Sequence, residues 1–183
     1  MIRLLDFLAA FFGLILLSPF ILIIAAILFA EHRKPFFIQK RVGKDQKLFT
    51  LIKFRSMSPK AANLPTHEIS VDLITKTGKF IRATKLDELP QLWNVLKGEM
   101  SLVGPRPCLP TQEELISERV SREVFSLRPG ITGPAQVQNI DMSTPKKLAI
   151  EDSKMVGNLK LSNYFKYVLM TVTGSGQGDK VRN

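Results

Sequence analysis

Residues 4–30 read LLDFLAAFFGLILLSPFILIIAAILFA and form the longest apolar run of the chain. Its only interruptions are Asp6, Gly13, Ser18 and Pro19. As one straight α-helix the run would be about 40 Å long, more than a hydrocarbon core of about 30 Å. A removable signal peptide is not expected, because no small-residue cleavage site follows the run. Residues 1–30 therefore predict a retained membrane anchor.

Pro19 leaves two geometries open for this anchor. Proline lacks an amide donor and disfavours helical geometry at the preceding Ser18, so the run can divide into two pieces that are each too short to cross. Arg3 lies before the run and Arg33 and Lys34 lie after it, so both flanks are predicted to be cytoplasmic. A re-entrant helix kinked at Ser18-Pro19 fits this pattern. A single span kinked by its proline is the alternative.

The rest of the chain is cationic. The 183 residues include 26 Lys or Arg and 16 Asp or Glu, for a formal charge of +10. Only Arg3 and Asp6 are charged within residues 1–30, so the excess positive charge lies beyond them. The single cysteine, Cys108, excludes an internal disulfide and a paired-cysteine zinc site, which suits a cytosol-facing domain. The length allows one domain, residues 31–173, with a glycine-rich flexible tail over residues 174–183.

Hydrophobic patterns predict an α+β fold that is mainly helical. Aromatic and β-branched residues over 36–42 and 48–54 predict a small β-hairpin, and residues 56–66 predict a loop. Periodic apolar positions and end signals predict four helices, over residues 86–98, 111–124, 144–155 and 159–171. Asp87 is expected to cap the first of these and Thr111 to open a capping box in the second. The last helix is amphipathic, so its apolar face could pack in a core or lie on lipid headgroups.

The adjacent carboxylates Asp87 and Glu88 form the first candidate site. A helix amino terminus favours phosphate, but two carboxylates there would repel an anion unless a cation intervenes. A hard cation such as Mg²⁺, held by carboxylates and substrate phosphates, would remove that conflict. Both residues are also ordinary at a helix start, so a purely structural role stays open.

Several cations could bind phosphate beside these carboxylates. Arg106 lies between two prolines, Arg128 precedes Pro129-Gly130, and Arg82 lies five residues before Asp87. Arginine forks match phosphate oxygens in pairs, so such residues could hold a diphosphate, although most arginines are solvated surface charges. Lys53 and Arg55 share this ambiguity, because alternation at a strand end explains them equally well.

The motifs and their order resemble one family. The segments are KFRSM over residues 53–57, LDELPQL over 86–92, NVLKGEMSLVGPRP over 94–107 and RPGITG over 128–133. With the Ser18-Pro19 interruption of the anchor, they resemble the bacterial sugar transferases, in the minimal form of the monotopic phosphoglycosyl transferases. The resemblance covers nearly the whole chain and makes residues 31–173 a catalytic domain.

The resemblance implies an activity and a site. It implies transfer of a sugar-1-phosphate from a UDP-sugar to polyprenyl (undecaprenyl) phosphate with release of UMP, initiating glycoconjugate synthesis at the cytoplasmic face of a bacterial inner membrane. Asp87 would be the nucleophile of a covalent phosphosugar intermediate, and Glu88, together with Asp87, would hold Mg²⁺. The substrate-binding candidates are Lys53, Arg55, Arg82, Arg106, Arg128 and Gln136. Membrane lipids are expected partners, nucleic acid is not, and a homodimer is compatible with the resemblance.

The carboxy-terminal third departs from the family pattern. Asp152 and Asn158 fit its late motif, whereas Pro134 and residues 138–141 differ from many relatives. The identity of the sugar therefore stays open. A different class of function also stays open on composition alone, namely a non-catalytic, membrane-anchored basic module that binds anionic lipid or nucleic acid.

Overall fold

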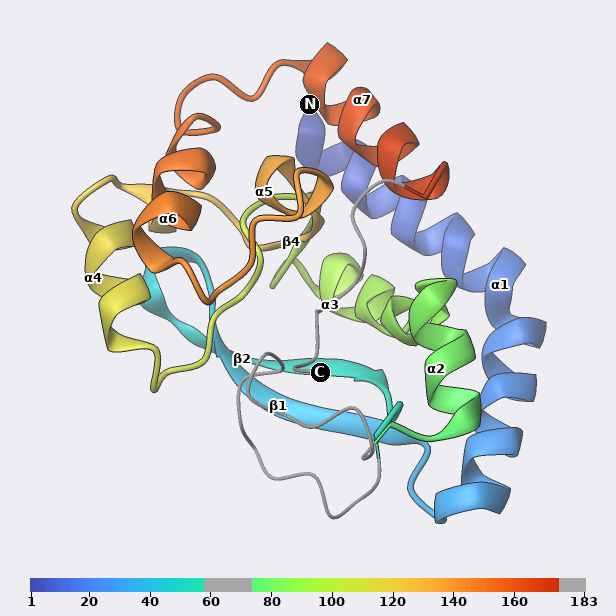
Figure 1. The fold of residues 1–183 in the computed structure, drawn as a ribbon. Coiled ribbons are helices and arrows are strands. Elements are labelled where there is room, and N and C mark those ends of the chain that lie inside the picture. Colours follow the sequence, from blue (N-terminus) through green and yellow to red (C-terminus); the bar gives the residue numbers. More distant parts are fainter. Residues whose placement is uncertain (58–73, 175–183) are drawn as a thin grey trace.

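The computed structural model describes residues 1–57 and 74–174 and confirms the mainly helical α+β class (Figure 1). The helices are α1 (Ile2–His32), α2 (Lys76–Ala83), α3 (Gln91–Lys97), α4 (Glu113–Val120), α5 (Pro134–Val137), α6 (Pro145–Ser153) and α7 (Leu161–Val172). The strands are β1 (Phe36–Val42), β2 (Leu48–Phe54), β3 (Ser101–Val103) and β4 (Gly130–Thr132). The predicted loop over 56–66 and the predicted tail lie mostly outside the described residues.

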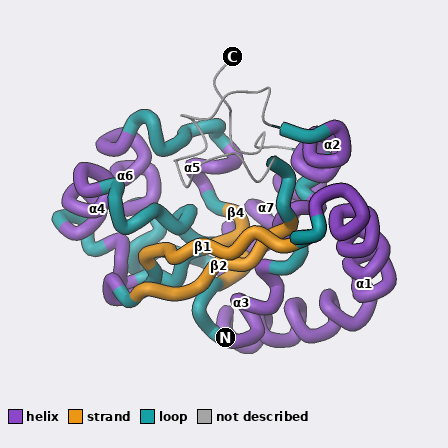
Figure 2. The backbone as a smooth tube through the Cα atoms, turned by 90° about the horizontal axis from the view of Figure 1, so that it is seen from below, coloured by secondary structure: helices purple, strands orange, loops and turns teal. Residues whose placement is uncertain are grey.

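The apolar run forms one helix, α1, of 31 residues that continues through Pro19. It is long and apolar enough to cross a membrane. Figure 2 shows that α1 changes direction along its length and follows the side of the domain. One face is buried there: Ala10 packs with the α3 residue Val95, and Leu28 packs with the β2 residue Phe54. Most other apolar side chains of α1 are exposed. The re-entrant geometry stays a prediction.

The predicted hairpin is confirmed over the predicted residues. Strands β1 and β2 pair antiparallel from Phe36 opposite Phe54 to Val42 opposite Leu48. Residues directly opposite each other share a face, so Arg41, Leu51 and Lys53 lie on one side of the hairpin. That side faces the interior of the domain, where Leu51 is buried.

A second sheet, the parallel pair β3 and β4, was not expected from the sequence. Its strands have three residues each, which is too short to show the alternation of apolar and polar residues that predicts a strand. The pair continues into a close backbone approach between Gly104 and Gly130. A Cβ atom on Gly130 would lie 2.0 Å from the Gly104 nitrogen, so a side chain at this position would collide with backbone. The glycines therefore hold the segment after β3 against the segment before β4.

Two predicted helix starts are wrong. The helix predicted over 86–98 is a 3-10 turn, Leu86–Glu88, followed by α3, because Pro90 cannot donate a backbone hydrogen bond inside a continuous helix. Gly98 ends α3 with φ 87°, as predicted. Thr111 does not cap α4; Gln112 stands at its start and accepts a hydrogen bond from the Leu109 amide at 2.9 Å. Helices α6 and α7 confirm the last two predictions to within a few residues.

Candidate active site

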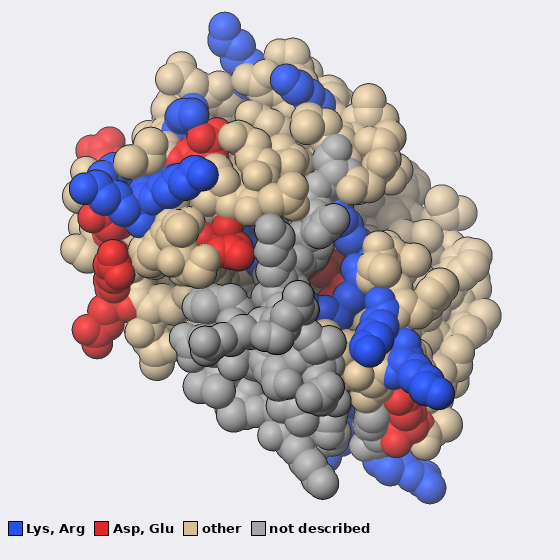
Figure 3. Space-filling view, in the orientation of Figure 1, with Lys and Arg blue, Asp and Glu red and all other residues tan. Residues whose placement is uncertain are grey.

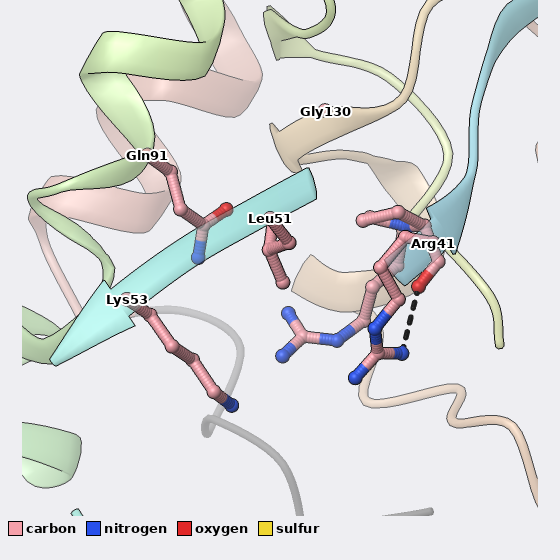
Figure 4. A pocket seen from close by; sticks show the side chains of 7 residues that line it. Arg41, Leu51, Lys53, Gln91 and Gly130 are labelled. Atoms are coloured by element: carbon pink, nitrogen blue, oxygen red, sulfur yellow. Dashed lines mark hydrogen bonds between the residues drawn. The ribbon is translucent and has the colours of Figure 1, made fainter. Parts of the chain in front are cut away.

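A pocket opens beside the hairpin and collects three cationic side chains. Its lining residues are Arg41, Leu51, Lys53, Gln91, Arg106, Pro107 and Gly130, and it holds about 290 Å³ of empty space including its opening to solvent. Figure 4 shows the Lys53 amine, the Gln91 amide and the Arg41 guanidinium directed toward the same space. Two guanidinium groups, an ammonium and an amide can together hold an anion with several oxygens.

Arg41 and Gln91 line the pocket but were not predicted from the sequence as site residues. Arg41 comes from β1, where Nη1 donates to the Pro107 carbonyl at 3.1 Å and Nη2 donates to Gln39 Oε1 at 2.6 Å. Gln91 is the first residue of α3 and is buried. The hairpin register carried a signal for Arg41, because it places this residue on the same face as Lys53. Gln91 belongs to the LDELPQL motif, and it reaches the pocket through the packing of α3 on β2.

The carboxylate pair lies on the 3-10 turn that precedes α3. Asp87 is 6% exposed, and Glu88 Oε1 accepts a hydrogen bond from Arg106 Nη1 at 3.2 Å. The prediction that Asp87 caps a helix is wrong: Lys85 precedes the turn, and no side chain caps it. The Glu88–Arg106 ion pair connects the carboxylates to the cationic pocket, because Arg106 also lines that pocket.

A buried ion pair supports the backbone of Arg106. Arg119 Nη1 donates to the Arg106 carbonyl at 2.8 Å, and Arg119 Nη2 contacts Asp152 Oδ2 at 2.6 Å. Both side chains of this pair are almost fully buried. Burial raises the pKa of Asp152, while the Arg119 charge acts in the opposite direction. The late aspartate noted in the sequence thus reaches the site through Arg119, a residue that no local pattern marked.

The remaining predicted site residues are outside the pocket lining, and their roles toward substrate stay predictions. Arg55 donates to the carbonyls of Lys34 and Phe36 at 3.1 and 3.3 Å. Arg128 Nε donates to the Gly98 carbonyl at 2.9 Å, and Gln136 Nε2 donates to the Ile131 carbonyl at 2.8 Å. Arg82 lies in the last turn of α2. Arg55, Arg128 and Gln136 therefore each stabilise the backbone through a side-chain hydrogen bond.

The donor set at the turn suits a hard divalent cation. Asp87 and Glu88 supply carboxylate oxygens, which Mg²⁺ prefers. Within residues 1–57 and 74–174 no three His, Cys, Asp or Glu side chains gather around one point. Mg²⁺ commonly takes only one or two carboxylates and completes its shell with water and substrate phosphates. Two adjacent carboxylates beside an anion pocket fit that mode of binding.

Comparisons with known proteins identify the relatives of the chain. A family model described as bacterial sugar transferase matches residues 1–177. The chain is 40% identical over 174 residues to the uncharacterized sugar transferase EpsL of Bacillus subtilis, covering 93% of this chain and 84% of that protein. It is 33% identical over 187 residues to a UDP-galactose-lipid carrier transferase of Erwinia amylovora, covering 93% of this chain and 39% of the relative.

A third relative has a more specific name. The chain is 41% identical over 143 residues to a UDP-glucose:undecaprenyl-phosphate glucose-1-phosphate transferase of Klebsiella pneumoniae, covering 74% of this chain and 30% of the relative. The chain thus spans most of EpsL but well under half of the two relatives whose names state a substrate.

Proposed function

The chain belongs to the bacterial sugar transferase family, and we propose that it transfers a sugar-1-phosphate from a UDP-sugar to undecaprenyl phosphate, releasing UMP. The observation that carries this proposal is the Glu88–Arg106 contact, which joins the carboxylate pair to a pocket of cations. A carboxylate can attack phosphorus only where neighbouring positive charge offsets the repulsion from the phosphate oxygens. The names of the Erwinia and Klebsiella relatives support the substrate classes.

In the first step, an Asp87 carboxylate oxygen attacks the phosphorus that carries the sugar. The new bond joins Asp87 to that phosphorus, while the bond to the bridging oxygen of UMP breaks and UMP leaves with its electron pair. In the second step, an oxygen of the lipid phosphate attacks the same phosphorus and the Asp87 carboxylate departs. The acceptor phosphate is already an anion, so no side chain needs to remove a proton from it.

The cations have distinct tasks in these steps. Arg106, Arg41 and Lys53 would bind the diphosphate and stabilise the charge that develops on the reacting oxygens. Glu88 fixes the Arg106 guanidinium through their ion pair. Asp87 and Glu88 would also hold Mg²⁺, which supplies further positive charge to the phosphate oxygens when bound.

The contacts of α1 support a re-entrant anchor. At its start, Arg3 donates to the Val95 carbonyl at 2.6 Å and Asp6 accepts from the Leu102 amide at 2.9 Å. Near its end, Leu28 is buried against Phe54. Both ends of α1 therefore contact the same domain, and a domain lies on one side of a membrane. A straight span would have to abandon one set of these contacts. Because basic residues flank the apolar run on both ends, we place the domain on the cytoplasmic face of a bacterial inner membrane.

An exposed apolar face on α7 extends the membrane contact. Phe165, Leu169 and Val172 are spaced as neighbours on one helical face, and all three are exposed. The start of α7 packs beside the start of α1 through Ile2 and Tyr164 (Figure 1). This face would lie at headgroup height, where a lipid phosphate and a soluble nucleotide sugar can both reach the pocket.

The charge distribution is less favourable to a non-catalytic basic module. Such a module needs a continuous basic face. On the face drawn in Figure 3, Lys and Arg lie in separate groups with Asp and Glu beside some of them. The module would also have no need for Glu88 to pair with Arg106 beside a pocket.

The test is UMP release by the full chain in lipid nanodiscs, with undecaprenyl phosphate and a panel of UDP-sugars. We expect release with at least one donor and its loss on adding a chelator. Asp87→Asn should abolish release, whereas Asp45→Asn, the same change in an exposed turn, should retain it. Full activity of Asp87→Asn would overturn the nucleophile, and no release with any donor would overturn the function.

A further inference from the structure

Lys85 connects the carboxylate turn to α7, at a residue 86 positions further along the chain. It directly precedes the turn Leu86–Glu88, and its carbonyl accepts a hydrogen bond from the Glu88 amide at 3.2 Å. Its side-chain Nζ donates to the Thr171 carbonyl at 3.3 Å. Thr171 lies in the last turn of α7. The backbone of Lys85 thus holds Glu88 while its side chain holds α7.

The backbone conformation of Lys85 restricts the start of the carboxylate turn. Lys85 has φ 57° and ψ 15°, in the small left-handed region that a residue with a Cβ atom rarely occupies. That region is narrow, so the backbone at the start of the carboxylate turn has little freedom to move.

Helix α7 makes a hydrogen bond to the rest of the domain near each end, and its apolar face is exposed. At its start, the Tyr164 hydroxyl donates to Asp6 Oδ1 at 2.8 Å. At its end, the hydroxyls of Thr171 and Thr132 are 2.5 Å apart. The exposed apolar face continues the apolar surface of α1, which packs beside the start of α7. A lipid surface is the occupant that this continuity favours.

We propose that Lys85 is a positioning residue that couples the seating of α7 on the lipid surface to the placement of Asp87 and Glu88. This inference rests on the proposed function. When lipid binds the apolar face of α7, the position of the Thr171 carbonyl is fixed. The hydrogen bond from Lys85 Nζ then fixes the position of the turn that carries both carboxylates. The competing explanation is that Lys85 only caps the last carbonyls of α7, which would affect stability alone.

The kinetic test uses Lys85→Met and Lys85→Arg in the full chain in nanodiscs of phosphatidylglycerol and phosphatidylethanolamine. We expect kcat for UMP release to fall by roughly 10- to 100-fold in Lys85→Met, because misplacing reacting groups by about 1 Å has effects of that size. The KM for the UDP-sugar should stay unchanged, and Lys85→Arg should restore most of the loss. Lys154→Met, which removes an exposed lysine paired with Glu151, is the matched control.

A second readout does not depend on activity. Hydrogen exchange of the amides of residues 86–89 should be slower in nanodiscs than in detergent for the unaltered chain. Leu169→Asp, which places a charge on the lipid face of α7, should accelerate that exchange, and Lys85→Met should remove the difference between the two media. If Lys85→Met exchanges like the unaltered chain in both media, or only its unfolding temperature changes, the coupling is wrong. If the coupling holds while no donor yields UMP, the proposed function alone fails.

Discussion

Tyr164 donates its hydroxyl hydrogen to Oδ1 of Asp6 at 2.8 Å, joining the N-terminal part of α1 to the first turn of α7 across 158 residues of sequence. The same oxygen accepts hydrogen bonds from the Ser101 hydroxyl at 3.0 Å and the Leu102 amide at 2.9 Å. Asp6 is 2% exposed, and three donors make its buried charge tolerable. Asp6, the acidic residue that interrupts the apolar run, therefore links the anchor to the domain through these hydrogen bonds.

Removing one of the hydrogen-bond donors to Asp6 should destabilise the folded protein. Burial and the hydrogen bond to Asp6 raise the pKa of Tyr164, so its hydroxyl stays a donor across the physiological range. We expect Tyr164→Phe to lower the free energy of unfolding by about 1.5–3 kcal/mol, the usual size for a hydrogen bond to a charged group. Denaturant unfolding in micelles measures this loss. Tyr167→Phe on the same helix is the control, and equal losses in both variants would contradict the assignment.

The Ser18 hydroxyl has a specific role inside α1. It donates to the Ile15 carbonyl at 2.8 Å, the carbonyl that the amide of residue 19 would bond if that residue were not proline. Ser18→Ala should therefore lower stability by about 1 kcal/mol in nanodiscs. In a Pro19→Ala background the same change should have little effect, because the new amide satisfies Ile15. Equal losses in the two backgrounds would show that the hydroxyl does not replace the missing donor.

Arg106 should be sensitive even to a change that keeps its charge. Lysine cannot reproduce the planar fork that would let Arg106 bind a substrate phosphate while it contacts Glu88. We expect Arg106→Ala to lower kcat/KM for UMP release by about 100-fold or more, with a smaller but clear loss in Arg106→Lys. Arg122, whose partner is Glu118 one turn earlier on the surface, is the matched control, and Arg122→Lys should be near normal. Normal turnover of Arg106→Lys would argue against bidentate binding.

Cys108 should be inert in the folded protein. It is fully buried, and burial raises the pKa of its thiol, so the reactive thiolate is scarce near neutral pH. We expect a maleimide reagent to leave the native chain unlabelled at pH 7.5 and to label it completely in denaturant, as followed by mass. Rapid labelling of the native chain would mean that the segment after Arg106 opens readily.

Because the Cys108 thiol is expected not to react in the native chain, an added cysteine can report the membrane topology of α1. A single cysteine added next to Met1 would then be the only site that reacts in the native chain. A re-entrant α1 predicts that this site is labelled from the cytoplasmic side alone, whereas a single span with a cytoplasmic domain predicts labelling from the outside.

Local interactions explain why much of the fold could be predicted. Helix and strand periodicity come from neighbouring residues, so the sequence identified α1, the hairpin, α6 and α7 with small errors at their ends. The wrong predictions arose where a nearby residue prevented the helix start that a local sequence pattern indicated. Pro90 interrupted the helix predicted from Asp87, and Gln112 took the place expected for Thr111 at the start of α4.

The sequence by itself determined the anchor, the cationic domain and the motifs around Asp87 and Arg106 that led to the family. Only the tertiary structure decided which of these residues meet. Glu88 and Arg106 pair across 18 residues, Arg41 and Gln91 join the pocket from two separate elements, and Lys85 reaches Thr171. Such contacts depend on how β1, β2, α3 and α7 pack together. That packing is the sum of many weak contacts between distant residues and is not set by any local pattern.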